Sequence, residues 1–170
     1  MRRLSLGLVL LANLCSAHAG CPQVQSSGPY PTVDAEWLLK NIQTEPDSLE
    51  GCAVALQGVV EEVAYGTTHR PALKIGLDGA LHKSIWLLPF TEPGEYKFAP
   101  PETRVRFMGW LRSTEEMLKI EAPEEIAKGP KLAVMTLCLI RAPSGDARFS
   151  SKWIEKCRAW EHRELPHPLQ

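Results

Sequence analysis

Residues 52–63 read CAVALQGVVEEV, and residues 103–114 read TRVRFMGWLRST. In both stretches apolar residues alternate with other residues up to a lone glycine, Gly58 or Gly109, and further apolar residues follow it. Alternation with a period of two is typical of a strand with one buried face, and a glycine inside a strand often marks a bulge. Both stretches therefore predict strands that bend as they join a curved sheet.

Three further runs predict strands: RPALKIGLD at 70–78, ALHKSIWLLPF at 80–90 and EMLKIEAP at 116–123. Asp78-Gly79 is a strong hairpin signal, so the second and third strands should be neighbours. Short strands at this spacing predict an all-β barrel or sandwich, and we expect a barrel over residues 51–122. Residues 91–102 should connect its third and fourth strands, with a helical turn around Tyr96.

The alternation also predicts which side chains face the interior of the barrel. In the first and second strands these are Val54, Leu56, Val60, Leu73, Ile75 and Leu77. In the fourth and fifth they are Val105, Phe107, Gly109, Leu111, Leu118, Ile120 and Ala122.

The order of these runs resembles the OB-fold, a five-stranded Greek-key barrel, and in particular the small bacterial OB domains of the tRNA-anticodon-binding type. The resemblance is carried by residues 54–60, 103–111 and 118–122. It implies a mainly β barrel over residues 51–122. With the N-terminal helix and the C-terminal helical extension that the flanking sequence predicts, the fold is α+β overall. OB-fold domains bind nucleic acids, sugars, metals or other proteins, so the fold alone does not select a ligand.

The first residues, MRRLSLGLVLLANLCSAHAG, have the three parts of a secretory signal. Arg2 and Arg3 precede an apolar run, and Ala17-His18-Ala19 is a small-x-small cleavage site. Cleavage after Ala19 predicts a periplasmic or secreted protein. Without Arg2 and Arg3, 17 of the 19 Lys and Arg residues remain beside 20 Asp and Glu residues, a net charge of −3. This value disfavours a nucleic-acid-binding role.

Cys21 leaves an alternative open, because a cysteine directly after a leader can carry a lipid anchor. His18 stands where a lipoprotein signal has a leucine-like residue, so we expect cleavage after Ala19 and membrane attachment only if Cys21 is lipidated. No other segment predicts a transmembrane helix.

Four cysteines follow the leader, and an even number in an exported chain favours two disulfides. Four cysteines allow three connectivities. We expect Cys138–Cys157, which ties the C-terminal elements together, and Cys21–Cys52, which pins the N-terminal arm to the first strand; four buried free thiols are the alternative.

The segments flanking the barrel are residues 20–50 and 123–170. In the first, Thr32 is a candidate N-cap for a helix ending near Gln43, and we expect Trp37 to pack on the barrel or close one of its ends. In the second, residues 131–140 read KLAVMTLCLI, which predicts either a strand or a buried helix. Residues 152–164 predict an amphipathic helix capped by Ser150 or Ser151 and carrying Cys157.

The candidate binding face lies on the outside of strands two to four. Its predicted ligand-binding residues are Lys74, Trp86, Arg104, Arg106, Trp110 and Arg112, with Lys83 nearby. Cations beside aromatic rings bind single-stranded nucleic acid on some OB surfaces. However, residues 51–122 hold eight basic and nine acidic residues, and an exported protein meets little nucleic acid.

These observations predict a non-enzymatic binding module that engages an envelope protein, a glycan or a small ligand, without a cofactor. We find no phosphate-binding loop, nucleophile elbow, H-E-x-x-H pair or C-x-x-C motif, and we predict no catalytic or metal-binding residues. The alternative is a small hydrolase or metal-dependent enzyme built on Cys157, His162 and His167.

Overall fold

The computed structural model describes residues 20–25, 30–66, 71–89, 99–120, 122–142, 144, 147–149 and 154–161. The predicted leader 1–19 lies outside these residues, as do the turn around Tyr96, the caps Ser150 and Ser151, and the tail with His162 and His167. Within the described residues, no helix has the length and apolar character needed to cross a bilayer.

Five strands form a closed barrel. They are β1 (Ala53–Tyr65), β2 (Pro71–Leu77), β3 (Ser84–Pro89), β4 (Arg104–Ser113) and β5 (Leu132–Arg141). The sheet order is β3-β2-β1-β4-β5, extended by β6 (Ala147–Phe149) at the edge. All of these neighbours are antiparallel, and a parallel pairing of β3 with β5 closes the barrel. The protein is therefore mainly β with added helices, and its barrel is compatible with an OB-like fold.

The position predicted for the fifth strand is wrong. Residues Thr114–Lys119 form the helix α3, and Glu124–Lys128 form the short 3-10 helix η2. The fifth strand of the barrel is β5, which pairs with β4 from Val105↔Arg141 to Ser113↔Leu132. The barrel thus extends beyond residue 122, and Ile120 is 43% exposed rather than inside it.

The two strand glycines lie where neighbouring backbones approach closely. A Cβ at Gly58 would overlap the carbonyl oxygen of Gly76, and one at Gly109 would overlap that of Met135. The bulge predicted at Gly109 is confirmed, because the register of β4 with β5 shifts between Met108 and Gly109. In β1 the shift comes later, between Val60 and Glu62.

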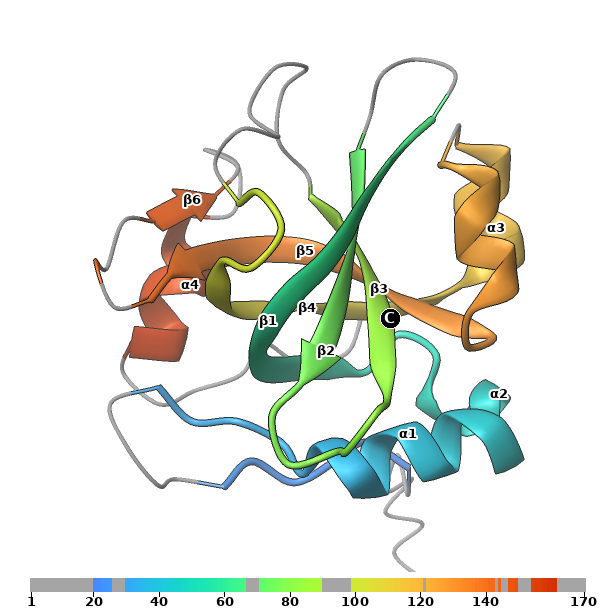
Figure 1. Ribbon diagram of the computed structural model, residues 1–170. Coiled ribbons are helices and arrows are strands. Elements are labelled where there is room, and N and C mark those ends of the chain that lie inside the picture. Colours follow the sequence, from blue (N-terminus) through green and yellow to red (C-terminus); the bar gives the residue numbers. More distant parts are fainter. Residues whose placement is uncertain are drawn as a thin grey trace, which may run out of the picture.

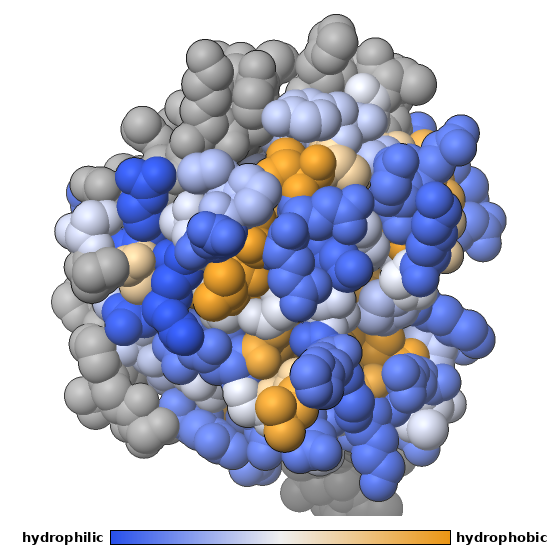
Figure 2. Space-filling view, viewed as in Figure 1, coloured by the Kyte–Doolittle hydropathy of each residue, from blue (hydrophilic) through white to orange (hydrophobic). Residues whose placement is uncertain are grey.

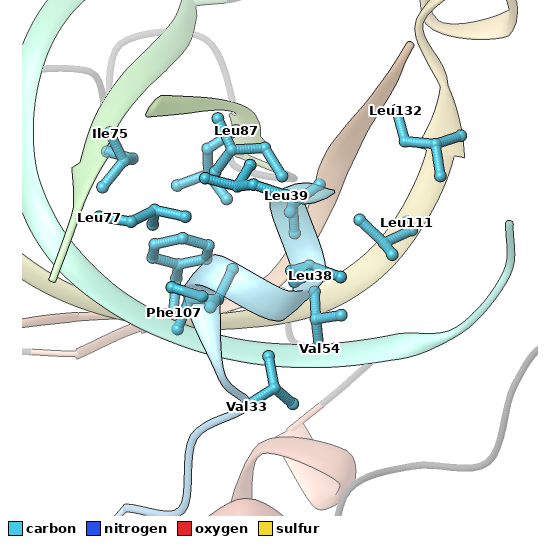
Figure 3. Close-up of a cluster of buried hydrophobic side chains, with 14 of the residues drawn as sticks. Val33, Leu38, Leu39, Val54, Ile75, Leu77, Leu87, Phe107, Leu111 and Leu132 are labelled. Carbon is cyan, nitrogen blue, oxygen red and sulfur yellow. The ribbon is translucent and has the colours of Figure 1, made fainter. Parts of the chain in front are cut away.

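The helix α1 (Ala35–Thr44) closes one end of the barrel, as Figure 1 shows. Its N-cap is Asp34, whose carboxylate accepts a hydrogen bond from the backbone N–H of Trp37 at 2.8 Å, so the prediction of Thr32 as the cap is wrong. Leu38 and Leu39 project among the inward-facing residues of the strands (Figure 3), and Ile42 is also fully buried. Trp37 does not fill this role, because it is 41% exposed.

The barrel interior confirms the predicted inward faces of three strands, β1, β2 and β4. The main buried cluster combines the α1 leucines with Val54, Leu56, Val60, Leu73, Ile75, Leu77, Val105, Phe107 and Leu111. A short second helix, α2 (Pro46–Leu49), adds Leu49 to the same cluster before β1 begins.

Two smaller apolar clusters lie outside the barrel wall. Met117 of α3 and Ile126 of η2 pack with Trp86 and Leu88 of β3. Cys157 and Trp160 of α4 (Ile154–Glu161) pack with Trp110 of β4. In Figure 1, α3 and α4 lie on opposite sides of the barrel. The elements after β4 therefore cover two parts of the outer surface.

Both predicted disulfides are present, Cys21–Cys52 and Cys138–Cys157. The first joins the N-terminal arm to the residue before β1, and the second joins β5 to α4. The backbone N–H of Val33 donates to the carbonyl of Ala55 at 2.8 Å, so the end of the arm also contacts β1. The alternative of four free thiols is wrong.

Candidate functional site

The six predicted ligand-binding residues lie on three strands, but they do not form one surface. Lys74 on β2 is directly opposite Trp86 on β3. Arg104, Arg106, Trp110 and Arg112 all lie on β4. Because β1 lies between β2 and β4 in the sheet order, the first two residues are separated from the other four.

Neither predicted tryptophan is an open platform for a ligand. Trp86 is 4% exposed and Trp110 is 1% exposed. Both lie outside the barrel interior, as expected, but α3 and η2 contribute residues that cover Trp86, and α4 contributes residues that cover Trp110. Both tryptophans of the predicted binding face are therefore covered by other parts of the protein.

The arginines of β4 mainly contact other parts of the protein. Arg104 forms an ion pair with Asp78, the hairpin residue after β2. The guanidinium carbon of Arg106 lies 5.3 Å from the centre of the Tyr30 ring, within range of a cation–π contact. Tyr30 in turn packs against Trp160, with ring centres 5.2 Å apart. Arg112 is half-buried opposite Ala133 of β5.

The structure instead places a basic pocket beside Lys74 and Trp86. Its volume is about 560 Å³. Four segments line it: α1, β2, the start of β3 with the residues before it, and residues 128–131, from the last residue of η2 to the residue before β5. The lining residues are Leu39, Gln43, Lys74, His82, Lys83, Ser84, Trp86, Lys128, Gly129, Pro130 and Lys131.

Positive charge dominates this pocket. Four of its described lining residues are lysines, and none is a carboxylate. Lys74 has two distant acidic neighbours, with its Nζ 3.9 Å from a carboxylate oxygen of Glu61 and of Glu62. Among the described residues, no carboxylate lies within 4.0 Å of the ammonium groups of Lys83, Lys128 or Lys131. Three of the four lysines in the pocket therefore lack an acidic partner among the described residues.

Gly129 shapes the wall of the pocket. A Cβ at this position would lie 2.5 Å from Cδ1 and 2.9 Å from Nε1 of Trp86. Only glycine lets the backbone approach the indole ring this closely. The contact brings Lys128 and Lys131, on either side of Gly129, to the same pocket as Lys74.

Sequence reasoning identified Lys74, Lys83 and Trp86 but missed Lys128 and Lys131. The available signal was KGPK at 128–131, two lysines around a turn dipeptide. The sequence did not place this segment on the barrel, because the fifth strand was expected at 116–123, before the segment, whereas β5 follows it.

A second hollow of about 410 Å³ lies beside the N-terminal arm. Gly20, Cys21 and Pro22 line it together with Asp34 and Trp37, and Gln23 and Gln25 complete the lining. Asp34 already caps α1 through the N–H of Trp37. This hollow brings together fewer charged groups than the basic pocket does.

The predicted C-terminal Cys/His site loses its cysteine. Cys157 is bonded to Cys138, so its thiolate is not available to a metal ion. His162 and His167 lie outside the described residues. In the described part of the chain, no three His, Cys, Asp or Glu side chains are arranged as a metal site.

Comparison of the chain with protein-family models, curated proteins and solved structures found no match. The class of the protein therefore rests on its strand order, its parallel β3–β5 closure and its two disulfides. These features define a disulfide-linked five-stranded barrel that is compatible with an OB-like fold, and a basic pocket lies on its outer wall.

Proposed function

We propose that this protein is an exported, non-enzymatic binding module that engages an envelope protein, a glycan or a small ligand. Its binding site is the basic pocket on the outer wall of β2 and β3. The site is narrower than the surface expected from the sequence, because the β4 residues belong to another part of the molecule. The tRNA-anticodon-binding type of OB domain is its proposed structural relative.

The disulfides support export. Such bonds form and persist in the periplasm and outside the cell, and they are rare in the cytosol. Cys21 also bears on the leader: a thiol bonded to Cys52 is not available for a lipid anchor. This supports cleavage after Ala19 and a periplasmic or secreted protein rather than a lipoprotein.

The environments of the tryptophans argue against single-stranded nucleic acid as the partner. Nucleic-acid-binding OB surfaces combine a basic groove with exposed rings on which successive bases stack. Here Trp86 and Trp110 are covered by the protein's own helices. The lysines can attract an anion, but neither ring is open for stacking.

The observation that carries the proposal is the convergence of four lysines on one pocket. Its volume lies within the range of about 300–1,000 Å³ that is common for small-ligand sites. Figure 2 shows a mostly hydrophilic face, on which hydrophobic residues form a few areas separated by polar ones. Such a surface favours a polar ligand over a broad hydrophobic interface.

The proposal can be tested by photocrosslinking in the exporting cell. A photoreactive amino acid replaces Gln43 or Ser84, which line the pocket, and in a control it replaces Glu155, which is exposed on α4. We expect defined adducts from the two pocket positions and none from Glu155. The adduct mass would identify a protein, a glycan or a small ligand. Equal labelling from all three positions, or none from the pocket, would contradict the proposal.

A further inference from the structure

We infer that the pocket selects a compact polyanion: a small molecule, or one unit of a larger chain, that carries at least two carboxylate or phosphate groups. This inference rests on the proposed binding function and names the chemistry of the ligand at the same site.

The first argument is charge. Lys74 and Lys83 flank one hairpin, Lys128 and Lys131 lie more than 40 residues further along the chain, and folding brings the two pairs around one cavity. Like charges gathered this way repel one another, and the low-dielectric walls of a pocket concentrate their field. Only Lys74 has described carboxylates within 4.0 Å, and both of those contacts are long and half-exposed. A bound polyanion would supply the missing negative charge.

The second argument is the type of cation. All four strongly basic residues in the lining are lysines, and arginine is not among the described lining residues. Arginine presents a planar fork that suits bidentate pairing, whereas a lysine ammonium acts as a compact point charge with three donors. Several separate point charges suit a ligand whose anionic groups are separate from one another. Lysine ammonium groups bind phosphate and carboxylate groups alike.

The third argument is size and lining. A cavity of about 560 Å³ is much larger than a single inorganic ion needs. Gln43 and Ser84 add neutral hydrogen-bonding groups, while Leu39, Trp86 and Pro130 add apolar wall. The ligand therefore has a polar or hydrocarbon framework between its anionic groups, rather than being a lone phosphate.

Calorimetric titration of the full oxidised mature chain tests this inference. Tripolyphosphate is the phosphate probe and citrate the carboxylate probe, and sucrose and spermine serve as neutral and cationic controls. We expect 1:1 binding of at least one anionic probe with Kd below about 1 mM, weakening as salt is added. The stronger of the two probes identifies the anionic group. No saturable binding of either probe, or equal binding of spermine, would overturn the inference.

A matched pair of double variants locates the binding. Lys128→Gln with Lys131→Gln removes two charges from the pocket, and Lys40→Gln with Lys119→Gln removes two from α1 and α3 outside it. All four lysines are exposed, so both variants should fold. We expect the pocket pair to weaken binding about tenfold or more and the control pair less than about threefold. Equal weakening would overturn the inference.

The photocrosslinking experiment and the calorimetric titration distinguish failure of the proposed function from failure of this inference. Adducts from Gln43 and Ser84 without binding of either probe would leave the binding module intact and overturn only its polyanion ligand. Probe binding that is unaffected by the pocket pair would overturn the ligand assignment at this site.

Discussion

Trp110 and Trp37 have opposite environments, although both are large aromatic residues. Trp110 is 1% exposed and packs with Met108, Cys157 and Trp160 between the barrel wall and α4. Trp37 is 41% exposed on α1, next to the leucines that enter the barrel. A buried aromatic side chain contributes far more to stability than an exposed one, because its apolar surface is removed from water.

The pair therefore predicts unequal losses of stability. Trp110→Ala should lower the free energy of unfolding by about 3–5 kcal/mol, because it opens a cavity in a packed cluster. Trp37→Ala should lower it by about 1 kcal/mol or less, because much of the ring already contacts solvent. Urea denaturation of the oxidised protein measures both. A larger loss for Trp37→Ala than for Trp110→Ala would contradict the structure.

For single residues, the sequence predicted which face of a strand a side chain occupies better than it predicted whether that side chain is exposed to solvent. Alternation at 104–112 correctly placed Val105, Phe107 and Leu111 inside the barrel. It also placed Trp110 on the outer side, and that is correct. Alternation cannot report what later covers an outer residue, because α4 arrives from more than 40 positions further along the chain.

Among the elements, β5 and α3 show how tertiary packing obscures local pattern. The inner side of β5 contributes Leu132 and Val134 to the barrel core, while its outer side contributes Ala133 and Ile140 to the two outer clusters. A strand covered on both faces has a nearly continuous apolar run, which does not distinguish it from a buried helix. Residues 116–123 alternate by coincidence, and α3 is helical where Met117 packs towards Trp86.

Amide hydrogen exchange should separate these two elements. The amides of β5 from 133 to 139 should exchange slowly, because they lie within ladders to β4 and, in part, β3. The amides of α3 should exchange much faster, because it is a six-residue helix on the outside of the barrel. Mass-spectrometric exchange of the oxidised protein makes the comparison. Strong protection at 116–122 with rapid exchange across 133–139 would instead support the original strand assignment.

For the molecule as a whole, the two disulfides join the flanking segments to the barrel. They link residues 31 and 19 positions apart. In the chain-entropy model, closing loops of this size stabilises the folded state by roughly 3–4 kcal/mol each. The even number of cysteines predicted two disulfides but left three connectivities open, and the expected pairing is the one that the structure contains. They hold the arm and α4, neither of which lines the basic pocket.

The pocket was only partly predictable from the sequence, because some of its lining residues meet only in the complete fold. Lys74 and Lys83 flank a recognisable hairpin, so their proximity follows from local sequence. Lys128 and Lys131 join them only because η2 and the start of β5 return to the edge of β3. Leu39 and Gln43 join them only because α1 closes the barrel end. Such convergence depends on the complete topology and not on any motif.

The central claim is that this pocket is where a polyanion binds. Titration of the isotopically labelled oxidised protein with tripolyphosphate and, separately, with citrate, followed by amide chemical shifts, tests it most directly. We expect the largest changes at the backbone amides of Gln43, Ser84 and Gly129 and at the indole N–H of Trp86. The amide chemical shifts of Tyr30, on the arm, and of Glu155, on α4, should not change. Changes centred on those two residues, or no saturable change at all, would contradict the claim.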